Sequence, residues 1–293
     1  MKTGFHHYVP RFYLARFVNP NGRLWVFDKI TDHVFETTPK KIAGENKFYD
    51  IDDLKMIGED PLLLEKQLAD IESEAYKITE NWLYLLEAKG MNKIPQINRN
   101  IISLFLALQL QRTAEARIIL LQFAKTLQTM GKLKKEYDPE KDAHGLHTKL
   151  LWDKEFVDRM TKKIADCIWI FAKNDSGQPF YTSDNPTLIK SFDNRQWLLG
   201  SDLFETGMYI VYPLSPKWVL YCKDRQPWGK LENFDGLVSP VRLTKDMVNH
   251  ENSGQVGRST RFIFTNSPDF GFAKEYLKDY PVHSDPDRKR VGG

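Results

Sequence analysis

The sequence predicts an α+β protein in which a helical middle separates two β-rich ends. Alternating apolar and polar residues mark strands near the start, apolar residues at helical spacing fill the middle, and short apolar stretches bounded by turns follow. Because strands and helices are segregated along the chain, we expect antiparallel strands rather than alternating parallel units. We expect one domain over 1–293, β-rich at 1–55, helical at 60–173 and β-rich at 178–293.

The composition is that of a folded protein without a strong charge bias. Of the 293 residues, 41% are hydrophobic and 13% aromatic, which is enough for a sizeable core. Lys and Arg number 42 against 39 Asp and Glu, so a nucleic-acid-binding surface would have to be local. No apolar run reaches the roughly 18 residues of a membrane span, and no secretory signal is present. We therefore expect a cytoplasmic protein that is not inserted in a membrane.

Motifs of several enzyme classes are absent from the sequence. It contains no glycine-rich phosphate loop, no GxSxG elbow, no HExxH and no paired CxxC. Cys167 and Cys222 lie among apolar residues, which predicts two reduced core residues rather than a disulfide or a metal site. The basic run at the end, residues 285–290, is expected to be a solvated tail.

The opening stretch, residues 5–17, is rich in aromatic rings, histidine and arginine, so we expect it to be tucked into the fold. Pro10 disfavours helix at the residue before it, and residues 12–17 are expected to form one or two helical turns. The segments after this stretch read as strands. The expected strands are a hairpin of 23–28 with 33–37 and a third short strand at 47–51.

The middle of the chain has the apolar spacing of long helices, separated by one polar loop. The expected elements are a helix that starts at Asp60-Pro61 and ends before Gly90, a helix from Gln96 to Met130, a loop over 132–147 and a helix from Lys149 to Phe171. The last part reads as short strands and two short helices. Expected there are strand–turn–strand units at 180–189 and 208–222, a helix at 243–252, a strand at 261–265 and a helix at 270–280.

His7 is the first candidate for chemistry, because imidazole titrates near neutral pH and can act as a base, an acid or a metal ligand. The structural alternative is that one of His6 and His7 caps a packed cluster through a hydrogen bond to the backbone. Arg11 and Tyr13, in the same stretch, are expected to bind substrate.

Glu65 and Glu72 are the candidate metal ligands. They lie seven residues apart, so their side chains share one face of the expected helix, about 10 Å apart along its axis. Carboxylates at a buried edge can hold Mg²⁺ or Mn²⁺, the cofactors that we expect. A solvated helix flank, with Lys66 and Lys77 nearby, explains the pair equally well.

Gln109 and Arg112 interrupt the most apolar expected helix and fall on one of its faces. A buried guanidinium needs a partner, because an unpaired buried charge is costly. That partner is either a carboxylate, such as Glu65, Glu72 or Asp184, or the phosphate of a ligand. An internal salt bridge is the structural alternative.

Asp184 and Asn185 stand between two expected strands, directly before Pro186. Such a turn ties its side chains to the local backbone, and this alone would explain the residues. The functional interpretation places Asp184 at the mouth of a site as metal ligand or base, with Asn185 as a hydrogen-bond donor. Asn249, on a short expected helix, would line the same site.

Six motifs recur in order over nearly the whole chain: HHYVPRFYL at 6–14, WVFDK at 25–29, NKFY at 46–49, LQLQRT at 108–113, TSDNP at 182–186 and YPLSP at 212–216. With these motifs the sequence resembles a large bacterial family known as domain of unknown function 4238. Ala114 follows Arg112-Thr113 where the family pattern has proline. The resemblance implies one domain of about this size and brings no established activity or cofactor.

These candidates together predict a metal-dependent nuclease or related phosphodiester hydrolase, in bacterial defence against mobile elements. Histidine, carboxylates and a buried arginine from separate segments are the combination that such a site needs. The expected roles are His7, Asp184 and Arg112 in catalysis, Glu65, Glu72 and Asp184 at the metal, and Arg11, Tyr13, Gln109, Asn185 and Asn249 on the nucleic acid. Two alternatives remain: a non-catalytic nucleic-acid- or protein-binding module with aromatic stacking, and a small-molecule enzyme that binds an anionic substrate.

Overall fold

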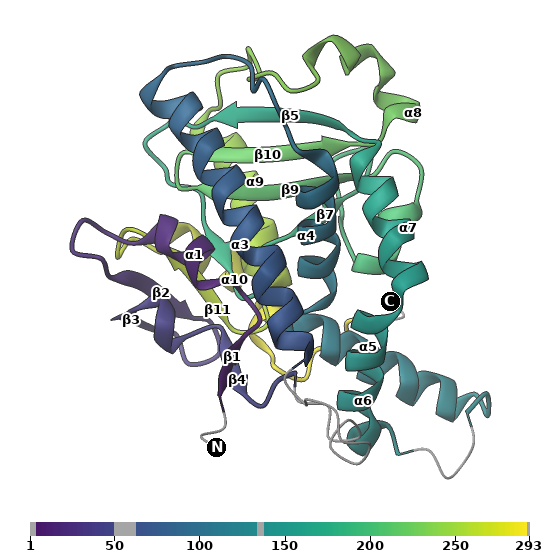
Figure 1. Ribbon diagram of the computed structural model, residues 1–293. Helices are drawn as coiled ribbons and strands as arrows, with labels where there is room; N and C mark the ends of the chain where they lie inside the picture. Colours follow the sequence, from purple (N-terminus) through teal and green to yellow (C-terminus); the bar gives the residue numbers. More distant parts are fainter. Residues whose placement is uncertain (1–3, 50–62, 134–137, 292–293) are drawn as a thin grey trace.

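The fold is α+β, as predicted, and its strands form antiparallel sheets. The computed structural model describes residues 4–49, 63–133 and 138–291 (Figure 1). A five-stranded sheet has the order β5-β10-β9-β7-β8, a four-stranded sheet has the order β3-β2-β11-β6, and β1 pairs with β4. The strands are β1 Phe5–His7, β2 Leu24–Asp28, β3 His33–Thr37, β4 Gly44–Asn46, β5 Ile168–Lys173, β6 Thr182–Ser183, β7 Leu188–Lys190, β8 Trp197–Leu198, β9 Tyr209–Ser215, β10 Trp218–Lys223 and β11 Phe262–Thr265.

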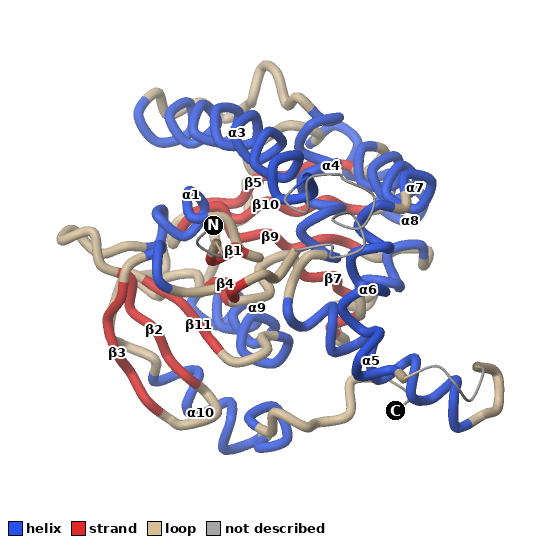
Figure 2. The backbone as a smooth tube through the Cα atoms, turned by 60° about the horizontal axis from the view of Figure 1, so that its bottom comes forward, coloured by secondary structure: helices blue, strands red, loops and turns tan. Residues whose placement is uncertain are grey.

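Helices cover both faces of the five-stranded sheet. Figures 1 and 2 show α3, α4 and α7 across one face and α9 on the other. The ring of Trp82 on α3 packs edge-on against Phe171 of β5, with ring centroids 5.3 Å apart, so burial of aromatic surface holds helix to sheet. The helices are α1 Arg11–Leu14, α3 Leu63–Leu83, α4 Arg99–Gln111, α5 Ala114–Thr129, α6 Pro139–Trp152, α7 Lys154–Ala165, α8 Arg225–Trp228, α9 Lys245–Arg258 and α10 Gly271–Asp279.

Short helical segments complete the described chain. One turn of π-helix extends α3, and the others are 3-10 segments that follow or link the longer elements. The π-helical turn is Tyr84–Ala88, and the 3-10 segments are Ala15–Phe17, Pro39–Lys41, Gly200–Phe204, Gly229–Phe234 and Pro281–Ser284.

The opening stretch is packed into the core, as expected. After β1, the chain forms α1 and the 3-10 turn that follows it, which confirms the predicted helical turns. Tyr13 and Phe17 are fully buried. The ring of Tyr13 stacks on Tyr212 of β9 at a centroid distance of 5.0 Å, so this stretch is anchored on the larger sheet.

The hairpin of β2 and β3 is confirmed, but the third strand lies earlier than predicted. It spans Gly44–Asn46 and pairs with β1 rather than extending the hairpin. Residues 47–49 form a turn, because Lys47 has a φ of 58°, a conformation that ends a strand. The rest of the predicted strand, like the predicted helix start at Asp60-Pro61, lies outside the described residues.

The predicted helix over 96–130 is two helices, α4 and α5. The chain breaks at Thr113, which has the extended ψ of 162° and whose side chain accepts a hydrogen bond from the Ala116 N–H at 3.2 Å. A threonine in this position satisfies an otherwise unpaired N–H at the helix start. The apolar spacing of the two helices hid this break.

The expectations for residues 132–171 were wrong in two places. Residues 139–147, expected in a loop, belong to α6 (Pro139–Trp152), which starts with Pro139 at its first position, where proline is favoured. The predicted helix over 149–171 contains the end of α6, then α7, capped by Asp153, and then β5. The continuous apolar run of β5 is compatible with the periodicity of a helix or of a strand. Its pairing with β10 shows that it is a strand.

The C-terminal strands and helices are present, with one change of arrangement. The strands on either side of Ser183-Asp184-Asn185-Pro186 belong to different sheets, β6 to the four-stranded sheet and β7 to the five-stranded sheet. β9 and β10 form the predicted hairpin, although β9 runs through Pro213 and Leu214 rather than turning there. The predicted helix over 243–252 is α9, which continues to Arg258.

The basic run at the end is not a solvated tail. The Arg288 and Arg290 side chains are buried, and both form ion pairs with Glu115 of α5, at 3.0 and 2.9 Å. A buried carboxylate requires such partners, and the tail supplies them.

The largest hydrophobic cluster contains residues from Tyr8 to Phe264, so N-terminal, helical and C-terminal segments share it. Cys167 and Cys222 are buried free thiols, as predicted. None of the helices in the described ranges combines the length and apolar character needed to cross a membrane.

Candidate functional site

A cavity of about 610 Å³, which we call the His7 cavity, opens between β1, α1 and α3. Five of the predicted site residues, from separate segments of the chain, line it together: His7, Arg11, Glu65, Glu72 and Arg112. The other residues that line it are Phe5, Phe12, Lys40, Tyr49, Leu68, Ala69, Ser73 and Tyr76. Cationic, acidic and aromatic groups therefore meet in one place.

His7 is half-buried and held by a backbone carbonyl. Its Nε2 lies 3.1 Å from the Lys40 carbonyl oxygen, which can only accept a hydrogen bond. The neutral ring therefore carries its hydrogen on Nε2, and Nδ1 is the atom that takes up a proton. Burial lowers the pKa of His7 and the charge of Arg11 lowers it further, while the Lys40 carbonyl opposes both. The imidazole is thus a neutral base at pH 7.

His6 takes the structural role that the sequence left open between the two histidines. It is fully buried, and its Nδ1 accepts a hydrogen bond from the Tyr49 N–H at 3.1 Å. Its Nε2 lies 2.8 Å from Oε2 of Glu65 on α3. His6 thereby fixes β1 against α3 and leaves its neighbour to line the cavity.

Arg112, the residue after α4, is tied to the cavity wall by internal contacts. Its Nη2 donates to Glu72 Oε1 at 2.6 Å and to the His7 carbonyl oxygen at 2.8 Å, and its Nε donates to the Tyr49 hydroxyl at 3.1 Å. Burial alone would lower the pKa of Arg112, but Tyr49 and Glu72 hold it above its usual value. Burial also raises the pKa of Tyr49, to about 12. The carboxylate partner of Arg112 is Glu72, and the arginine positions His7 through the backbone.

Two cations in the His7 cavity have no such partner. Arg11 and Lys40 are exposed, and neither forms an ion pair with any residue in the described ranges. Phe5 and Tyr76 place exposed rings beside them, 39% and 46% accessible. Free cations beside exposed rings form a surface suited to a phosphate with an attached base.

Sequence reasoning missed Lys40 and Tyr76. A signal for Tyr76 existed, since it continues the face of α3 that carries Glu65 and Glu72, four residues after the second. Lys40 lies in the 3-10 segment Pro39–Lys41, which is too short for periodicity to report which way a side chain points.

Asp184 does not line the His7 cavity. Its carboxylate accepts backbone hydrogen bonds from Thr260, Arg261 and Phe262 at 2.8, 2.7 and 2.8 Å. Burial raises the pKa of Asp184, and these three donors oppose that effect. The side chain fastens the end of β6 to the start of β11. Asp184 is thus structural, but its partners are distant backbone groups and not the local backbone that the turn explanation expected.

Tyr13 and Gln109 also lie outside the cavity, in the core. The Tyr13 hydroxyl lies 2.7 Å from Thr182 Oγ1, and the Gln109 amide donates to the Tyr8 carbonyl oxygen at 3.0 Å. Both side chains were predicted to bind substrate, Gln109 because it is polar in an apolar helix. In the structure both side chains form hydrogen bonds with other buried polar groups of the protein.

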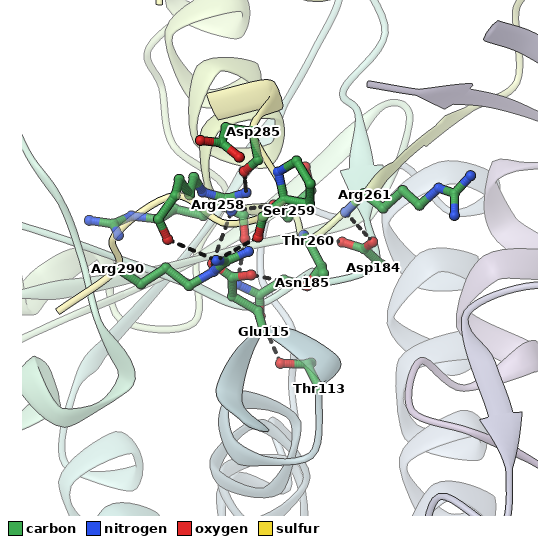
Figure 3. A network of polar contacts seen from close by, with 12 residues as sticks. Thr113, Glu115, Asp184, Asn185, Arg258, Ser259, Thr260, Arg261, Asp285 and Arg290 are labelled. Carbon is green, nitrogen blue, oxygen red and sulfur yellow. Dashed lines mark hydrogen bonds and ion pairs between the residues drawn. The ribbon is translucent and has the colours of Figure 1, made fainter. Parts of the chain in front are cut away.

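Asn185 and Asn249 are the remaining predicted residues, and the His7 cavity contains neither. Asn185 donates from Nδ2 to the Arg258 carbonyl oxygen at 3.0 Å and lines a different, apolar cavity (Figure 3). Asn249 is half-buried on α9. The turn and the helix were predicted in the right places, but their positions in space depend on sheet order.

The predicted metal ligands do not converge in the described ranges. No three His, Cys, Asp or Glu side chains there are placed to hold a metal ion. Glu72 is bonded to Arg112, Glu65 contacts His6, and Asp184 is bonded to β11. These residues do not fit Mg²⁺ or Mn²⁺ as they stand, so we derive no step through a metal.

The fold and the His7 cavity define an α+β protein with a cationic, aromatic-lined site. The chain belongs to the family described as "Protein of unknown function (DUF4238)", whose model matches residues 6–269, and this confirms the resemblance of the sequence. No curated protein and no solved structure matches the chain. All the residues of the site from His7 to Arg112 lie within the matched range.

Proposed function

We propose that the protein binds single-stranded nucleic acid at the His7 cavity and hydrolyses a phosphodiester bond there. The observation that supports this is that His7, held by a carbonyl oxygen, shares one cavity with Arg11 and Lys40, two cations that no residue of the described ranges pairs. A base with a free nitrogen and donors for a phosphate are the minimum set for hydrolysis without a covalent intermediate.

The proposed reaction assigns one role to each group. Nδ1 of His7 takes the proton of a water molecule as its oxygen bonds to phosphorus. The bond from phosphorus to the leaving oxygen breaks, and solvent water protonates that oxygen. Arg11 and Lys40 bind the phosphate and stabilise the charge that grows on its oxygens. Phe5 and Tyr76 stack on the adjacent bases, which favours single strands over duplexes.

The first test is cleavage of labelled single-stranded DNA and RNA by the purified protein. His7→Gln should slow cleavage by about 10²–10⁴-fold, the usual contribution of a general base, and Arg11→Ala should weaken both binding and rate. His33→Gln is the matched control for the histidine, because His33 is exposed on β3 outside the cavity. Arg195→Ala is the control for the arginine, since its side chain is 83% accessible. Both controls should cleave like wild type.

Each reaction is run with chelator, with Mg²⁺ and with Mn²⁺, which also tests the metal prediction made from the sequence. Intact substrates under all conditions, or full activity in His7→Gln, would contradict the proposal. Binding without cleavage, lost in Arg11→Ala, would favour the non-catalytic binding module instead.

A further inference from the structure

A second cavity, of about 490 Å³, lies between α5, α7 and the β7–β8 edge of the five-stranded sheet. We call it the Gln111 cavity. Its volume falls in the range of small-molecule sites, about 300–1,000 Å³. Most of its wall is apolar, and Ile119 and Leu120 of α5 and Leu198 of β8 contribute to it. It shares no lining residue with the His7 cavity.

Two buried polar atoms in this wall have no partner within the described ranges. They are Oε1 of Gln111 and Oγ1 of Thr187, in side chains that are 5% and 1% accessible. The Gln111 amide nitrogen donates to the Ala107 carbonyl oxygen at 3.2 Å, so Oε1 is the free end of a fixed group. Buried polar atoms are nearly always bonded in folded proteins, so these two atoms indicate a missing partner.

Arg258, at the end of α9, adds a cation to the same wall. It donates from Nη2 to the Trp197 carbonyl oxygen, but no carboxylate of the described residues forms an ion pair with it. The nearby carboxylate of Glu115 is already bonded by Arg288 and Arg290 (Figure 3). Burial lowers the pKa of Arg258. Arg258 is half-buried, and the negative charges of Glu115 and Asp202, which line the same cavity, oppose the effect of burial. A partly buried guanidinium that no carboxylate of the described residues bonds directly favours an anionic ligand.

Asn185 links the three segments that carry these polar groups. Its Oδ1 accepts from Thr113 Oγ1, just after Gln111, at 3.3 Å, and its Nδ2 donates to the Arg258 carbonyl oxygen at 3.0 Å. Thr187 follows two residues later in the chain. The segments that carry Gln111, Thr187 and Arg258 are therefore joined through Asn185 beside an apolar chamber.

We propose that the Gln111 cavity binds a small apolar carboxylic acid that also carries a hydroxyl group. Its chain or ring occupies the apolar chamber, and its carboxylate accepts hydrogen bonds from Arg258 and Thr187. Its hydroxyl donates to Oε1 of Gln111, an atom that can only accept. The two buried atoms of the wall that lack a partner in the described ranges, Gln111 Oε1 and Thr187 Oγ1, would then each have a hydrogen bond. This class of ligand is inferred from the residues that line the Gln111 cavity. It does not depend on the reaction proposed for the His7 cavity.

The test is calorimetric titration of the whole chain with 3-hydroxydecanoic acid, decanoic acid and decan-1-ol. The hydroxy acid should bind best and the alcohol worst. Ile119→Trp, which fills the chamber, and Arg258→Gln should each weaken binding of the hydroxy acid by about tenfold or more. Ile118→Trp is the matched control on the same helix, because Ile118 does not line the cavity, and it should bind like wild type.

Thr187→Val keeps the side-chain shape and provides a second variant if the tryptophan prevents folding, which circular dichroism would reveal. It too should weaken the hydroxy acid. No saturable binding, equal affinity for the alcohol, or unchanged binding in Ile119→Trp, Arg258→Gln and Thr187→Val would each overturn the proposal. Equal affinity for decanoic acid would overturn the assignment of a ligand hydroxyl to Gln111.

Discussion

Neighbouring histidines in this protein have different roles because their surroundings differ. His6 is enclosed and bonded to Glu65 and to the backbone of Tyr49, whereas His7 lies at a cavity beside Arg11. Since β-strand side chains alternate between faces, adjacent residues necessarily point in opposite directions. The sequence identifies the pair, and only the pairing of β1 with β4 decides which ring meets solvent.

The protonation of His7 gives a prediction about pH. The neutral imidazole is the proposed base, and its pKa is lowered from the ordinary value of 6.5. Cleavage should therefore rise with pH, with the midpoint of the rise below that value. Arg11→Gln removes a positive charge that lowers the pKa, so the acid limb of its profile should move to higher pH. The measurement is kcat/KM against pH for wild type and Arg11→Gln, with Arg195→Gln as control. A limb that stays in place would contradict the effect of the Arg11 charge on the pKa of His7.

Two buried threonines in one short segment give a prediction about stability. The Thr182 hydroxyl is bonded to Tyr13, whereas that of Thr187 has no partner in the described ranges. Thr182→Val leaves the Tyr13 hydroxyl unsatisfied and should cost about 1–3 kcal/mol of unfolding free energy. Thr187→Val should be neutral or stabilising in the ligand-free protein. Denaturant unfolding of both variants measures the difference, and equal losses would contradict the assignment of the unpaired hydroxyl.

Half of the predicted site residues line the His7 cavity. The other half were misassigned because a sequence pattern shows that a polar residue is buried but not what it binds. Polar residues in apolar surroundings indicate a buried polar group, as at Gln109 and Asp184. Such residues do not indicate whether another part of the protein or a ligand forms the hydrogen bond to the buried group. The exposed residues Arg11 and Lys40, which the structure leaves unpaired within the described ranges, carry weaker sequence signals because exposed cations are common.

At the scale of elements, helix ends were predicted well where a glycine interrupts the helical pattern. Helix starts were predicted poorly where only a capping residue marks them. Gly90 and Gly131 end their helical patterns, whereas Thr113 and Asp153 start new helices within apolar or charged runs. A cap residue contributes a hydrogen bond without interrupting the apolar spacing, so periodicity alone does not reveal it.

The α3 helix shows how an element builds a site. Glu65, Glu72 and Tyr76, at spacings of seven and four residues along it, lie on one wall of the His7 cavity. This face was predicted from the sequence. Its partner, β1, is a strand of three residues whose pairing with β4 joins segments about forty residues apart, and local patterns carry no information about that pairing.

At the scale of the whole molecule, the fold class followed from the order of elements, but the assignment of strands to sheets did not. The strands around Asp184 belong to two sheets because β6 pairs with β11, a strand from the end of the chain. Contacts between distant parts of the chain also place Arg288 and Arg290 against α5. Glu115 of that helix accepts from Arg288, Arg290 and Thr260, so one carboxylate joins three distant segments.

That junction gives a prediction about the stability of the whole fold. Glu115→Gln leaves Arg288 and Arg290 buried without a countercharge, so the free energy of unfolding should fall by about 3–5 kcal/mol. Glu275→Gln, at an exposed position of α10, is the matched control and should change it by less than about 0.5 kcal/mol. Thermal and denaturant unfolding measure both variants.

Adding Arg290→Gln to Glu115→Gln distinguishes the loss of countercharge from a general disruption of α5. Removing one of the two uncompensated cations relieves part of the penalty, so the double variant should be less destabilised than the sum of the single variants. Additive losses would mean that the carboxylate and Arg290 stabilise the protein independently, and the ion pair at 2.9 Å would then be incidental to the anchoring of the C-terminal segment.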